Sequence, residues 1–343
     1  MTAGNPKLLT IILNYRTPEL TLRATEAALH EMTDLDGEIL IVENGSADNS
    51  LGMLQDQVDK RGWAADGRVR VVDAGRNGGF GAGVNFGIRT GLNSGEAPDF
   101  YYLLNSDAWP DAGAIRVLCD FLINHPKAGM AGSYIHGEEG EPHRTAFRFP
   151  SAAGEFEMAA RTGVVSRLFQ NAIVPIEIPK STTRIDWTAG ASLMIRRAMI
   201  DEIGGFDETF FLYFEETDLC LRAARAGWEV YYLPDSSVAH IGSASTGMKS
   251  WDRTPPYWFD SRLHYFRKNH GSLYAGVATM ARLAGSAIYG LRRLISGKPQ
   301  ADPDRFMGDL AAHWLRNLRP SAPGAATGGD LAPTVMTRTK DSQ

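Results

Sequence analysis

The feature that most constrains the fold is an alternation, over the first 107 residues, between short apolar runs and longer segments of helical character. The apolar runs at 8–13, 38–42, 68–73 and 100–104 are typical of strands buried on both faces. Thr17, with Pro18 after it, predicts the start of a helix that runs to about residue 32, and a second helix is expected to end near residue 61. Repeated strand–helix units predict a parallel sheet with right-handed crossovers.

Polar residues follow each of the four predicted strands. They are Asn14, Tyr15 and Arg16 after the first, 43–48 after the second, 76–79 after the third, and Asn105, Ser106 and Asp107 after the fourth. Ligands of open parallel sheets bind at the carboxyl ends of the strands. Four polar clusters at these ends therefore predict a nucleotide-type site.

The glycine-rich segment 76–91 resembles a dinucleotide fingerprint, but it follows the third strand and not the first. No acidic residue ends a following strand at the expected distance. One interpretation is a connection that packs its helix closely. The other is a loop whose backbone N–H groups hold a diphosphate, with help from Arg76 and Asn77.

Asp107 is the candidate metal ligand in the first part of the chain. A cation that bridges a diphosphate needs one or two oxygen ligands from the protein and takes the others from phosphate and water. An Asp after a strand is commonly a helix cap, but Asp111, which follows Pro110, can fill that role. Asp107 is then left for chemistry.

The segment 204–240 contains Asp207, Glu215, Glu216 and Asp218 among many aromatic residues and ends on His240. A helix is predicted over 215–226 and a strand over 229–233, so His240 is expected on the loop after that strand. Glu215 and Glu216 fall in the first helical turn, where the helix dipole favours their ionised form. A carboxylate base near a histidine suits a metal-assisted transfer reaction.

Two further segments have open interpretations. Residues 146–151, with Arg144 and Arg148, form either a loop over the site or a solvated connector. Trp187 either stacks on a sugar face or is buried in the core.

The composition excludes some classes of protein. A net charge of −5 gives no basic footprint for nucleic acid, so none is expected as a partner. Cys119 and Cys220 make neither a disulfide framework nor a metal knuckle, which fits a reducing compartment. The apolar run near the N-terminus is too short for a signal peptide, and no stretch of about 20 residues is apolar enough to be a transmembrane helix.

The C-terminal part contains one long amphipathic pattern. Its apolar stripe consists of Leu273, Val277, Met280, Ala284, Ile288, Leu291 and Ile295. The first interpretation is that this stripe packs onto the catalytic domain. The alternative is shallow attachment to an anionic membrane surface.

Six motifs together resemble a family 2 glycosyltransferase of the GT-A fold, close to the bacterial rhamnosyltransferase-like branch. They are IILNYRTPE, IVENGSADNS, RNGGFGAGVNFGI, LLNSDAWP, WTAGASLMIRR and the segment from GGFDETFF to His240, and the resemblance covers about residues 7–270. It implies a Rossmann-like α/β fold with a mostly parallel central sheet flanked by helices. The expected division is a GT-A domain at 1–240, a helical region at 241–319 and a disordered tail at 320–343.

The resemblance implies an inverting, metal-dependent transfer of a sugar from a nucleotide diphosphate donor, with Mg²⁺ or Mn²⁺ as cofactor. The branch implies rhamnose from dTDP-rhamnose, and a hydroxyl of a glycan or lipid-linked glycan as the acceptor in cell-surface polysaccharide synthesis. The expected location is the cytoplasm, with peripheral attachment to the inner face of the plasma membrane and a homodimer as open alternatives.

The resemblance also assigns residues to roles. The donor side comprises Asn14, Tyr15, Glu43, Asp48, Arg76, Asn77, Asn85, Asn105 and Ser106. The metal ligands are Asp107 and His240, the acceptor side contains Trp187 and Gly190, and the general base is Glu216.

Two positions depart from the family pattern. Asn105 replaces the first Asp of the Asp-X-Asp motif, which weakens metal affinity, and Glu216 replaces the usual Asp base. Glu215 and Asp218 therefore remain alternative bases. Two other functions also stay open, namely a nucleotidyltransferase that makes sugar nucleotides and an inactive, binding-only relative.

Overall fold

The computed structural model describes residues 6–65, 67–242, 251–297 and 299–318. The tail predicted at 320–343 and most of the glycine- and serine-rich loop after His240 lie outside these ranges. Among the described helices, none combines the length and the apolar character that crossing a membrane requires.

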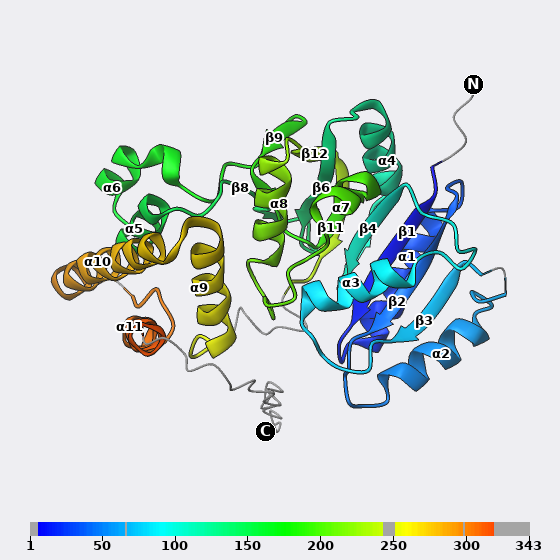
Figure 1. Cartoon of the computed structure of the whole chain (residues 1–343), viewed down its shortest axis with the longest axis horizontal. Helices are drawn as coiled ribbons and strands as arrows, with labels where there is room; N and C mark the ends of the chain where they lie inside the picture. Colours follow the sequence, from blue (N-terminus) through cyan, green and yellow to red (C-terminus); the bar gives the residue numbers. More distant parts are fainter. Residues whose placement is uncertain (1–5, 66, 243–250, 298, 319–343) are drawn as a thin grey trace.

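A large mixed sheet forms the centre of the molecule, with strand order β3-β2-β1-β4-β11-β6-β12-β5 (Figure 1). The strands are β1 (Leu8–Asn14), β2 (Gly37–Glu43), β3 (Val69–Asp73), β4 (Phe100–Asn105), β5 (Ala108–Pro110), β6 (Ala128–His136), β11 (Ser192–Arg196) and β12 (Glu229–His240). Neighbouring strands from β3 to β4 are parallel, β6 and β12 are parallel to each other, and β11 and β5 are antiparallel to their neighbours. The prediction of a mostly parallel central sheet is therefore confirmed.

The register of the parallel strands brings their polar ends together. Asn14 of β1 lies opposite Glu43 of β2, and Leu13 lies opposite Asn105 of β4. Equal strand ends place the residues that follow each strand at one edge of the sheet, as expected from the sequence.

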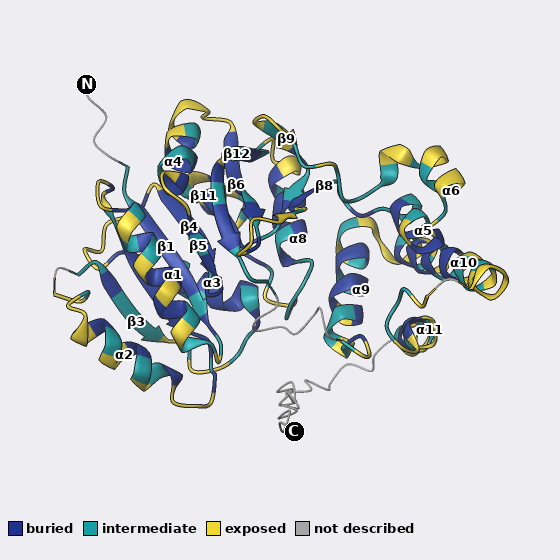
Figure 2. Ribbon diagram, turned by 180° about the vertical axis from the view of Figure 1, so that it is seen from behind, coloured by how far each residue is buried: buried dark blue, intermediate teal, exposed yellow. Residues whose placement is uncertain are grey.

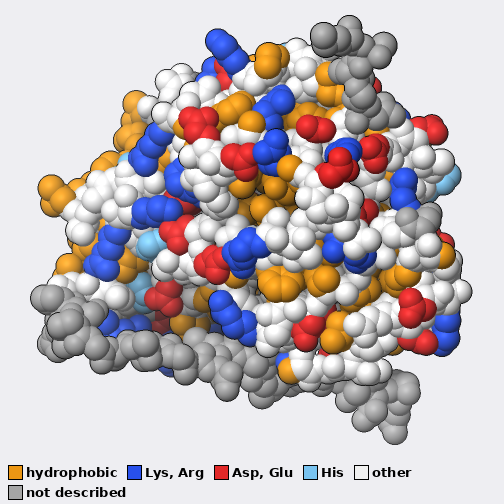
Figure 3. All heavy atoms as spheres, turned by 45° about the vertical axis from the view of Figure 1, so that its right-hand side comes forward, with side chains coloured by type: hydrophobic (Ala, Val, Ile, Leu, Met, Phe, Trp, Pro, Cys, Tyr) orange, Lys and Arg blue, Asp and Glu red, His pale blue; other side chains and the backbone are white. Residues whose placement is uncertain are grey.

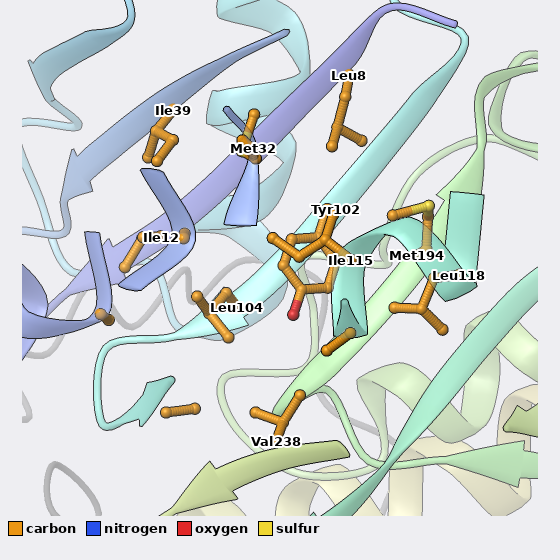
Figure 4. Packing of buried hydrophobic residues seen from close by; sticks show 14 of the residues in the cluster. Leu8, Ile12, Met32, Ile39, Tyr102, Leu104, Ile115, Leu118, Met194 and Val238 are labelled. Carbon is orange, nitrogen blue, oxygen red and sulfur yellow. The ribbon is translucent and has the colours of Figure 1, made fainter. Parts of the chain in front are cut away.

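Helices cover both faces of the sheet because alternate strand residues point to opposite sides. Even-numbered residues of β1, such as Leu8 and Ile12, pack with the helices of one face, and Leu9 and Ile11 pack with those of the other. Figure 4 shows the first of these two cores. The first face carries α1 (Pro18–Glu31), α2 (Ser50–Lys60) and α4 (Ala114–Asn124), and the second carries α3 (Phe80–Thr90), α7 (Arg197–Ile203) and α8 (Glu215–Arg225).

A group of helices lies beside the sheet domain (Figure 1, left). It contains α5 (Ala152–Ala160), α6 (Gly163–Leu168), α9 (Pro256–His270), α10 (Ser272–Ser296) and α11 (Phe306–Asn317), with a short 3-10 helix at Gln170–Ala172. Gly285 of α10 sits so close to α5 that a Cβ there would lie 2.6 Å from the Phe156 carbonyl oxygen. A buried ion pair joins α5 to α9, with Arg262 donating to Glu155 at 3.0 Å. The C-terminal helices thus pack with a segment from inside the range 1–240.

Four short strands complete the described secondary structure. They are β7 (Pro142–His143), β8 (Ala146–Phe147), β9 (Thr183–Ile185) and β10 (Trp187–Thr188). β8 pairs with β10 in a small separate sheet, so 146–147 is an ordered part of the fold.

Two local predictions are wrong. His240 is the last residue of β12 and does not lie on a following loop, because the strand resumes its pairing with β6 after an irregularity between Leu233 and Ser237. Thr17 makes no capping hydrogen bond to α1, and its hydroxyl instead lies 3.1 Å from the Ser106 hydroxyl.

The interpretation that the apolar stripe of α10 packs onto the catalytic domain is also wrong. Leu273, Val277 and Met280 are 86%, 51% and 60% exposed. The buried residues of α10 are Ala275, Ala278, Thr279, Arg282, Gly285 and Ser286, on the opposite side of the helix. The small residues on the buried side let α10 approach α5 closely. The larger apolar side chains of α10 consequently lie on the exposed side of the helix.

Candidate active site

A pocket of about 790 Å³ opens at the carboxyl edge of the sheet. Its lining includes ten of the residues predicted for the site: Tyr15, Asn77, Asn105, Ser106, Asp107, Trp187, Gly190, Glu215, Glu216 and His240. These residues come from the ends of β1, β4 and β12, from the loop before α3, from the turn after β10, and from the start of α8. The tertiary structure therefore brings donor-side, metal and acid residues of the sequence into one cavity.

The other predicted donor residues do not line the pocket and instead hold the loops around it. Both carboxylate oxygens of Glu43 accept backbone N–H groups, from Gly45 at 3.0 Å and from Ser46 at 2.8 Å. Asn14 is buried and accepts a hydrogen bond from the Thr21 hydroxyl. Asp48 accepts the N–H of Ser50 at the start of α2.

Asn85 and the glycines of α3 have a packing role in this structure. The amide of Asn85 donates to the Phe206 carbonyl oxygen and accepts the Phe206 N–H, which ties α3 to the loop before α8. Gly79 adopts φ +90°, and a Cβ there would overlap the Phe211 carbonyl. Glycine is needed at this position because the two backbones approach each other closely. Arg76 is exposed, and Asn77 accepts the N–H of Gly79.

Asp107 and His240 come together although they are far apart in the sequence. The Asp107 carboxylate lies 3.0 Å from Nε2 of His240, and the Asn105 amide nitrogen lies 3.3 Å from the same imidazole nitrogen. β12 pairs with β5 next to Asp107, which brings the histidine to this position. One carboxylate, one imidazole and one amide at a single point form a set of hard and borderline donors.

This donor set fits a divalent cation only in part. Within the described ranges, no group of three or more His, Cys, Asp or Glu side chains could hold a metal ion. Two protein ligands are nevertheless sufficient where a substrate diphosphate and water complete the coordination. Asp107 and His240 fit a cation that binds together with its diphosphate.

Glu216 lies on the wall of the pocket formed by the first turn of α8. Its Oε1 accepts the backbone N–H of Gly190 at 3.1 Å. A Cβ at Gly190 would lie 2.8 Å from the same oxygen, so a glycine is required for this contact. Burial raises the pKa of Glu216, while its own backbone N–H and that of Gly190 oppose the rise. The carboxylate is thus held in place and made more basic than an exposed one.

Glu215 has a different environment from its neighbour. It is buried, and its Oε2 has no hydrogen-bond partner among the described residues. Burial, followed by the negative charge of Glu216, raises the pKa of Glu215 well above its usual value of 4.5. Of two adjacent carboxyls that repel each other's charge, the less solvated one keeps the proton. Burial and the nearby charge of Glu216 therefore favour the protonated form of Glu215.

Asp218 does not line the pocket. Its carboxylate is fully buried and accepts hydrogen bonds from Arg222, Lys268 and Asn269 at 2.8, 2.8 and 2.9 Å. Lys268 and Asn269 belong to α9. Asp218 thus links α8 to the helical group, and its carboxylate oxygens are already engaged in these hydrogen bonds.

The turn before α8 is conformationally strained. Tyr213 and Phe214 both have φ +71°, a region that residues with a side chain rarely adopt. Each such residue costs on the order of 1–3 kcal/mol and persists only where the surrounding structure imposes it. This turn directs the first residues of α8 toward the pocket.

Aromatic side chains form much of the pocket wall, and most of them were not identified from the sequence. Trp187, which was, stacks on Phe147 with ring centroids 4.2 Å apart and donates its Nε1–H to the Arg148 carbonyl oxygen. The other aromatic residues of the lining are Tyr15, Phe80, Phe211, Tyr213, Phe214, Tyr257 and Trp258. The density of aromatic residues at 206–214 was the sequence signal that could have identified part of this wall. Tyr257 and Trp258 come from α9, and the sequence did not link that segment to the site.

The segment 142–150 is a wall of the pocket and not a solvated connector. Arg144, Thr145, Phe147 and Pro150 line the cavity. The Arg148 guanidinium points elsewhere and donates to the Ile173 carbonyl oxygen at 3.0 Å.

The central α/β sheet with its pocket at the carboxyl edge has the GT-A fold, and two solved structures align with it. A mannosyltransferase of Pyrobaculum calidifontis, solved in complex with GDP-Man and Mn²⁺, aligns with a TM-score of 0.52 at 14% identity over 92% of this chain and 88% of its own. GalNAc-T7, solved with UDP, GalNAc and Mn²⁺, aligns with a TM-score of 0.50 at 14% identity, and this chain covers 55% of it.

The sequence comparisons are more specific than the fold. The profile described as Glycosyl transferase family 2 matches residues 10–186, and the one described as Glycosyl transferase family group 2 matches residues 159–287. The chain belongs to glycosyl transferase family 2 and is an enzyme of the transferase class. It is 30% identical over 233 residues to an N-acetylglucosaminyl-diphospho-decaprenol L-rhamnosyltransferase of Mycobacterium tuberculosis, which covers 64% of this chain and 72% of that relative. The rhamnosyltransferase-like resemblance is therefore confirmed.

Proposed function

We propose that the protein transfers a rhamnosyl group from dTDP-rhamnose, with inversion, to a hydroxyl of a glycan that is linked through a diphosphate to a lipid. The name of the M. tuberculosis relative supports both the sugar and the class of acceptor. Such an acceptor lies in a membrane, so the reaction is placed at the inner face of the plasma membrane, in the synthesis of cell-surface polysaccharide.

The observation that carries the mechanism is the environment of Glu216, whose carboxylate accepts the Gly190 N–H and lines the same pocket as Asp107 and His240. In an inverting transfer, the acceptor oxygen forms a bond to the anomeric carbon while the bond from that carbon to the donor phosphate oxygen breaks. The nucleotide diphosphate leaves with the electron pair, and the acceptor hydroxyl proton passes to Glu216.

Neighbouring groups prepare Glu216 for this step. The N–H of Gly190 holds one carboxylate oxygen, which leaves the other to accept the proton. The raised pKa of Glu215, caused by burial and by the charge of Glu216, disfavours a second negative charge next to the base. We therefore assign the base to Glu216, and assign Glu215 and Asp218 to positioning.

The donor would lie between the ends of β1 and β4. Tyr15, Asn77, Asn105 and Ser106 line this part of the pocket and are the proposed donor contacts. Asn14, Glu43, Asp48 and Asn85 support the loops that carry them, and the exposed Arg76 precedes Asn77 in the chain and is a further proposed donor contact. Asp107 and His240 would hold Mg²⁺ or Mn²⁺, which would neutralise charge on the leaving diphosphate.

The aromatic wall with Trp187 and Gly190 is the proposed acceptor side. A flat indole ring presents an apolar face suited to the C–H face of a sugar. We also propose that the catalytic unit is the range 1–240 without α5 and α6, which belong with the C-terminal helices.

The test is a donor screen on the full chain with dTDP-rhamnose, UDP-sugars and GDP-sugars, each with and without Mn²⁺. The expected result is that dTDP-rhamnose with Mn²⁺ raises the melting temperature most, because ligand binding stabilises the folded state. Transfer is then measured as dTDP release with a short-chain N-acetylglucosaminyl diphospholipid. A larger shift with a GDP- or UDP-sugar, and transfer from it, would replace rhamnose as the donor.

The same material distinguishes the other candidate functions. Release of pyrophosphate from a sugar 1-phosphate and dTTP would identify a nucleotidyltransferase. A protein that binds the donors but neither transfers the sugar nor slowly hydrolyses the donor would be an inactive relative. Replacing Asp107 by Asn or His240 by Ala should remove the Mn²⁺-dependent part of the thermal shift, and an unchanged shift would refute the metal assignment.

A further inference from the structure

The helices α10 and α6 carry many exposed large apolar side chains, and exposed positions of both helices are yellow in Figure 2. We call this group of side chains the outer helical face, and its members are Val164, Leu168, Leu273, Val277, Met280, Ile288, Leu291, Leu294 and Ile295. Leu168, Leu294 and Ile295 are 76%, 85% and 78% exposed. Large apolar side chains that gather on one surface usually mark a place of interaction.

This face cannot be explained as a misplaced core. The residues of α10 follow a helical period of 3.6, so the exposed stripe and the buried set with Ala275, Ala278 and Arg282 lie on opposite sides. The buried side is fixed by the close contact of Gly285 with α5 and by Arg282, whose guanidinium lies near Glu155 and Asp302. Rotation of the helix would expose a charged, tightly packed side, so the apolar stripe is held outward.

The helices α6 and α10, which carry the outer helical face, contain basic residues and no Asp or Glu. The sequence contains no Asp or Glu at 158–176 or at 261–301, although the whole chain has a net charge of −5. Arg167 lies in the last turn of α6, and Arg292 and Arg293 lie in the last part of α10, while Arg161 before α6 pairs with Asp302. Figure 3 shows hydrophobic and basic side chains side by side along the left-hand edge, where the helical group lies. An apolar face whose own helices carry basic residues and no acids is complementary to an anionic lipid surface.

The outer helical face is also connected to the pocket. Met158 of α5 lines the cavity and is itself 38% exposed. Its neighbour in the same helix, Glu155, lines the cavity too and pairs with Arg262 of α9. Because α5 packs directly on α10, the surface and the cavity share one rigid group of helices.

We propose that the outer helical face docks the protein on the surface of an anionic lipid bilayer, with the side chains of α10 and α6 inserted among the acyl chains near the headgroups. The helix lies in the interface and does not span it. Docking goes beyond the proposed reaction, and it would bring the cavity to the membrane in which a lipid-linked acceptor resides.

The test is sedimentation of the full chain with vesicles of phosphatidylcholine that contain about 25% phosphatidylglycerol. The affinity of the double variant Leu291→Glu/Leu294→Glu for these vesicles should be at least about tenfold lower. The reason is that two inserted apolar side chains are lost and two negative charges that the lipid repels are added. Ile123→Glu is the matched control, since Ile123 is 47% exposed on α4, outside the outer helical face, and should change nothing. Binding of the wild type should fall at high salt and with pure phosphatidylcholine.

Two measurements separate docking from folding and from the reaction. Equal melting temperatures for the three proteins would show that the substitutions leave the fold intact. Transfer to a soluble short-chain acceptor should be unchanged in the double variant, while transfer to the acceptor in vesicles should fall. An incorrect rhamnosyl assignment would instead abolish transfer to the soluble acceptor in the wild type as well, so the two failures are distinguishable.

Several results would overturn the proposal. One is equal sedimentation of the wild type and the double variant, and another is no sedimentation of the wild type. A third is a wild type that is dimeric and a double variant that is monomeric by light scattering, with neither bound to vesicles. In that case the outer helical face joins two copies of this chain.

Discussion

Replacing Glu216 by Gln is the most direct test of the assignment of the base. The substitution keeps the shape of the side chain, and the amide oxygen of Gln can still accept the Gly190 N–H that Glu216 accepts at 3.1 Å. The position of the 187–191 turn should therefore be preserved. The change removes only the capacity to take a proton.

The expected loss follows from the role of a general base. Such a group contributes roughly 10²- to 10⁴-fold to the rate. At 1.36 kcal/mol for each factor of ten, this is about 2.7–5.5 kcal/mol of the activation barrier. Because burial favours the uncharged form of Glu215, Glu215→Gln is a small electrostatic change and should lower turnover far less.

The assay compares initial rates of nucleotide diphosphate release at saturating donor, with donor affinity measured separately by calorimetry. In Glu216→Gln, kcat and kcat/KM should fall together while donor affinity stays within about threefold, since only a transition-state interaction is lost. In the wild type, kcat/KM should rise with pH through the raised pKa of Glu216, because the base acts in its ionised form.

The reasoning is refuted by a Glu216→Gln variant with turnover near that of the wild type. It is equally refuted by a pattern in which Glu215→Gln or Asp218→Asn loses the activity and Glu216→Gln keeps it. Loss of donor affinity in parallel with turnover would indicate a binding role for Glu216.

Three further predictions concern the surroundings of the base. The pKa of Glu215 is raised in the folded state, while the unfolded chain releases this proton above about its usual pKa of 4.5, so Glu215 lowers stability progressively as the pH rises toward its folded pKa. The melting temperature of Glu215→Gln should therefore rise relative to that of the wild type between acidic and neutral pH. A difference in melting temperature that stays constant with pH would contradict the raised pKa. Gly190→Ala places a Cβ 2.8 Å from Oε1 of Glu216 and should lower kcat by about 10²-fold through misplacement of the base, whereas an unchanged kcat in steady-state kinetics would show that the contact can relax. Asp218→Asn should cost about 1–3 kcal/mol in urea unfolding because Arg222, Lys268 and Asn269 lose a charged acceptor, and turnover of the folded variant should remain close to the wild type.

Local patterns predicted the sheet domain well. The four apolar runs appear as β1 to β4, and no boundary differs from the predicted one by more than one residue. The polar residues at the ends of these strands meet at one edge of the sheet. This works because burial on both faces of a parallel sheet leaves a local signature in the residues themselves. The family motifs then pointed to the residues at that edge, and ten of those named line one pocket.

The predictions that failed depended on contacts between distant segments. His240 was expected on a loop, and it lies in β12 because pairing with β5 and β6 extends that strand. The helices α5 and α6 lie inside the first 240 residues, yet they pack with α10. Neither pairing is visible in the residues of one segment taken alone.

The sequence by itself determined the class of the protein, its central sheet and the set of side chains from which the site is built, because periodicity and motif spacing are local properties. Only the tertiary structure decided the role of each acid. Glu215, Glu216 and Asp218 share one helical turn, but their contacts differ. Glu215 is buried with one oxygen that has no hydrogen-bond partner among the described residues, Glu216 accepts an N–H at the pocket, and Asp218 is bound by α9. The structure likewise decided which side of α10 faces outward. Burial, hydrogen-bond partners and pKa depend on what the fold places nearby, and those neighbours come from distant parts of the chain.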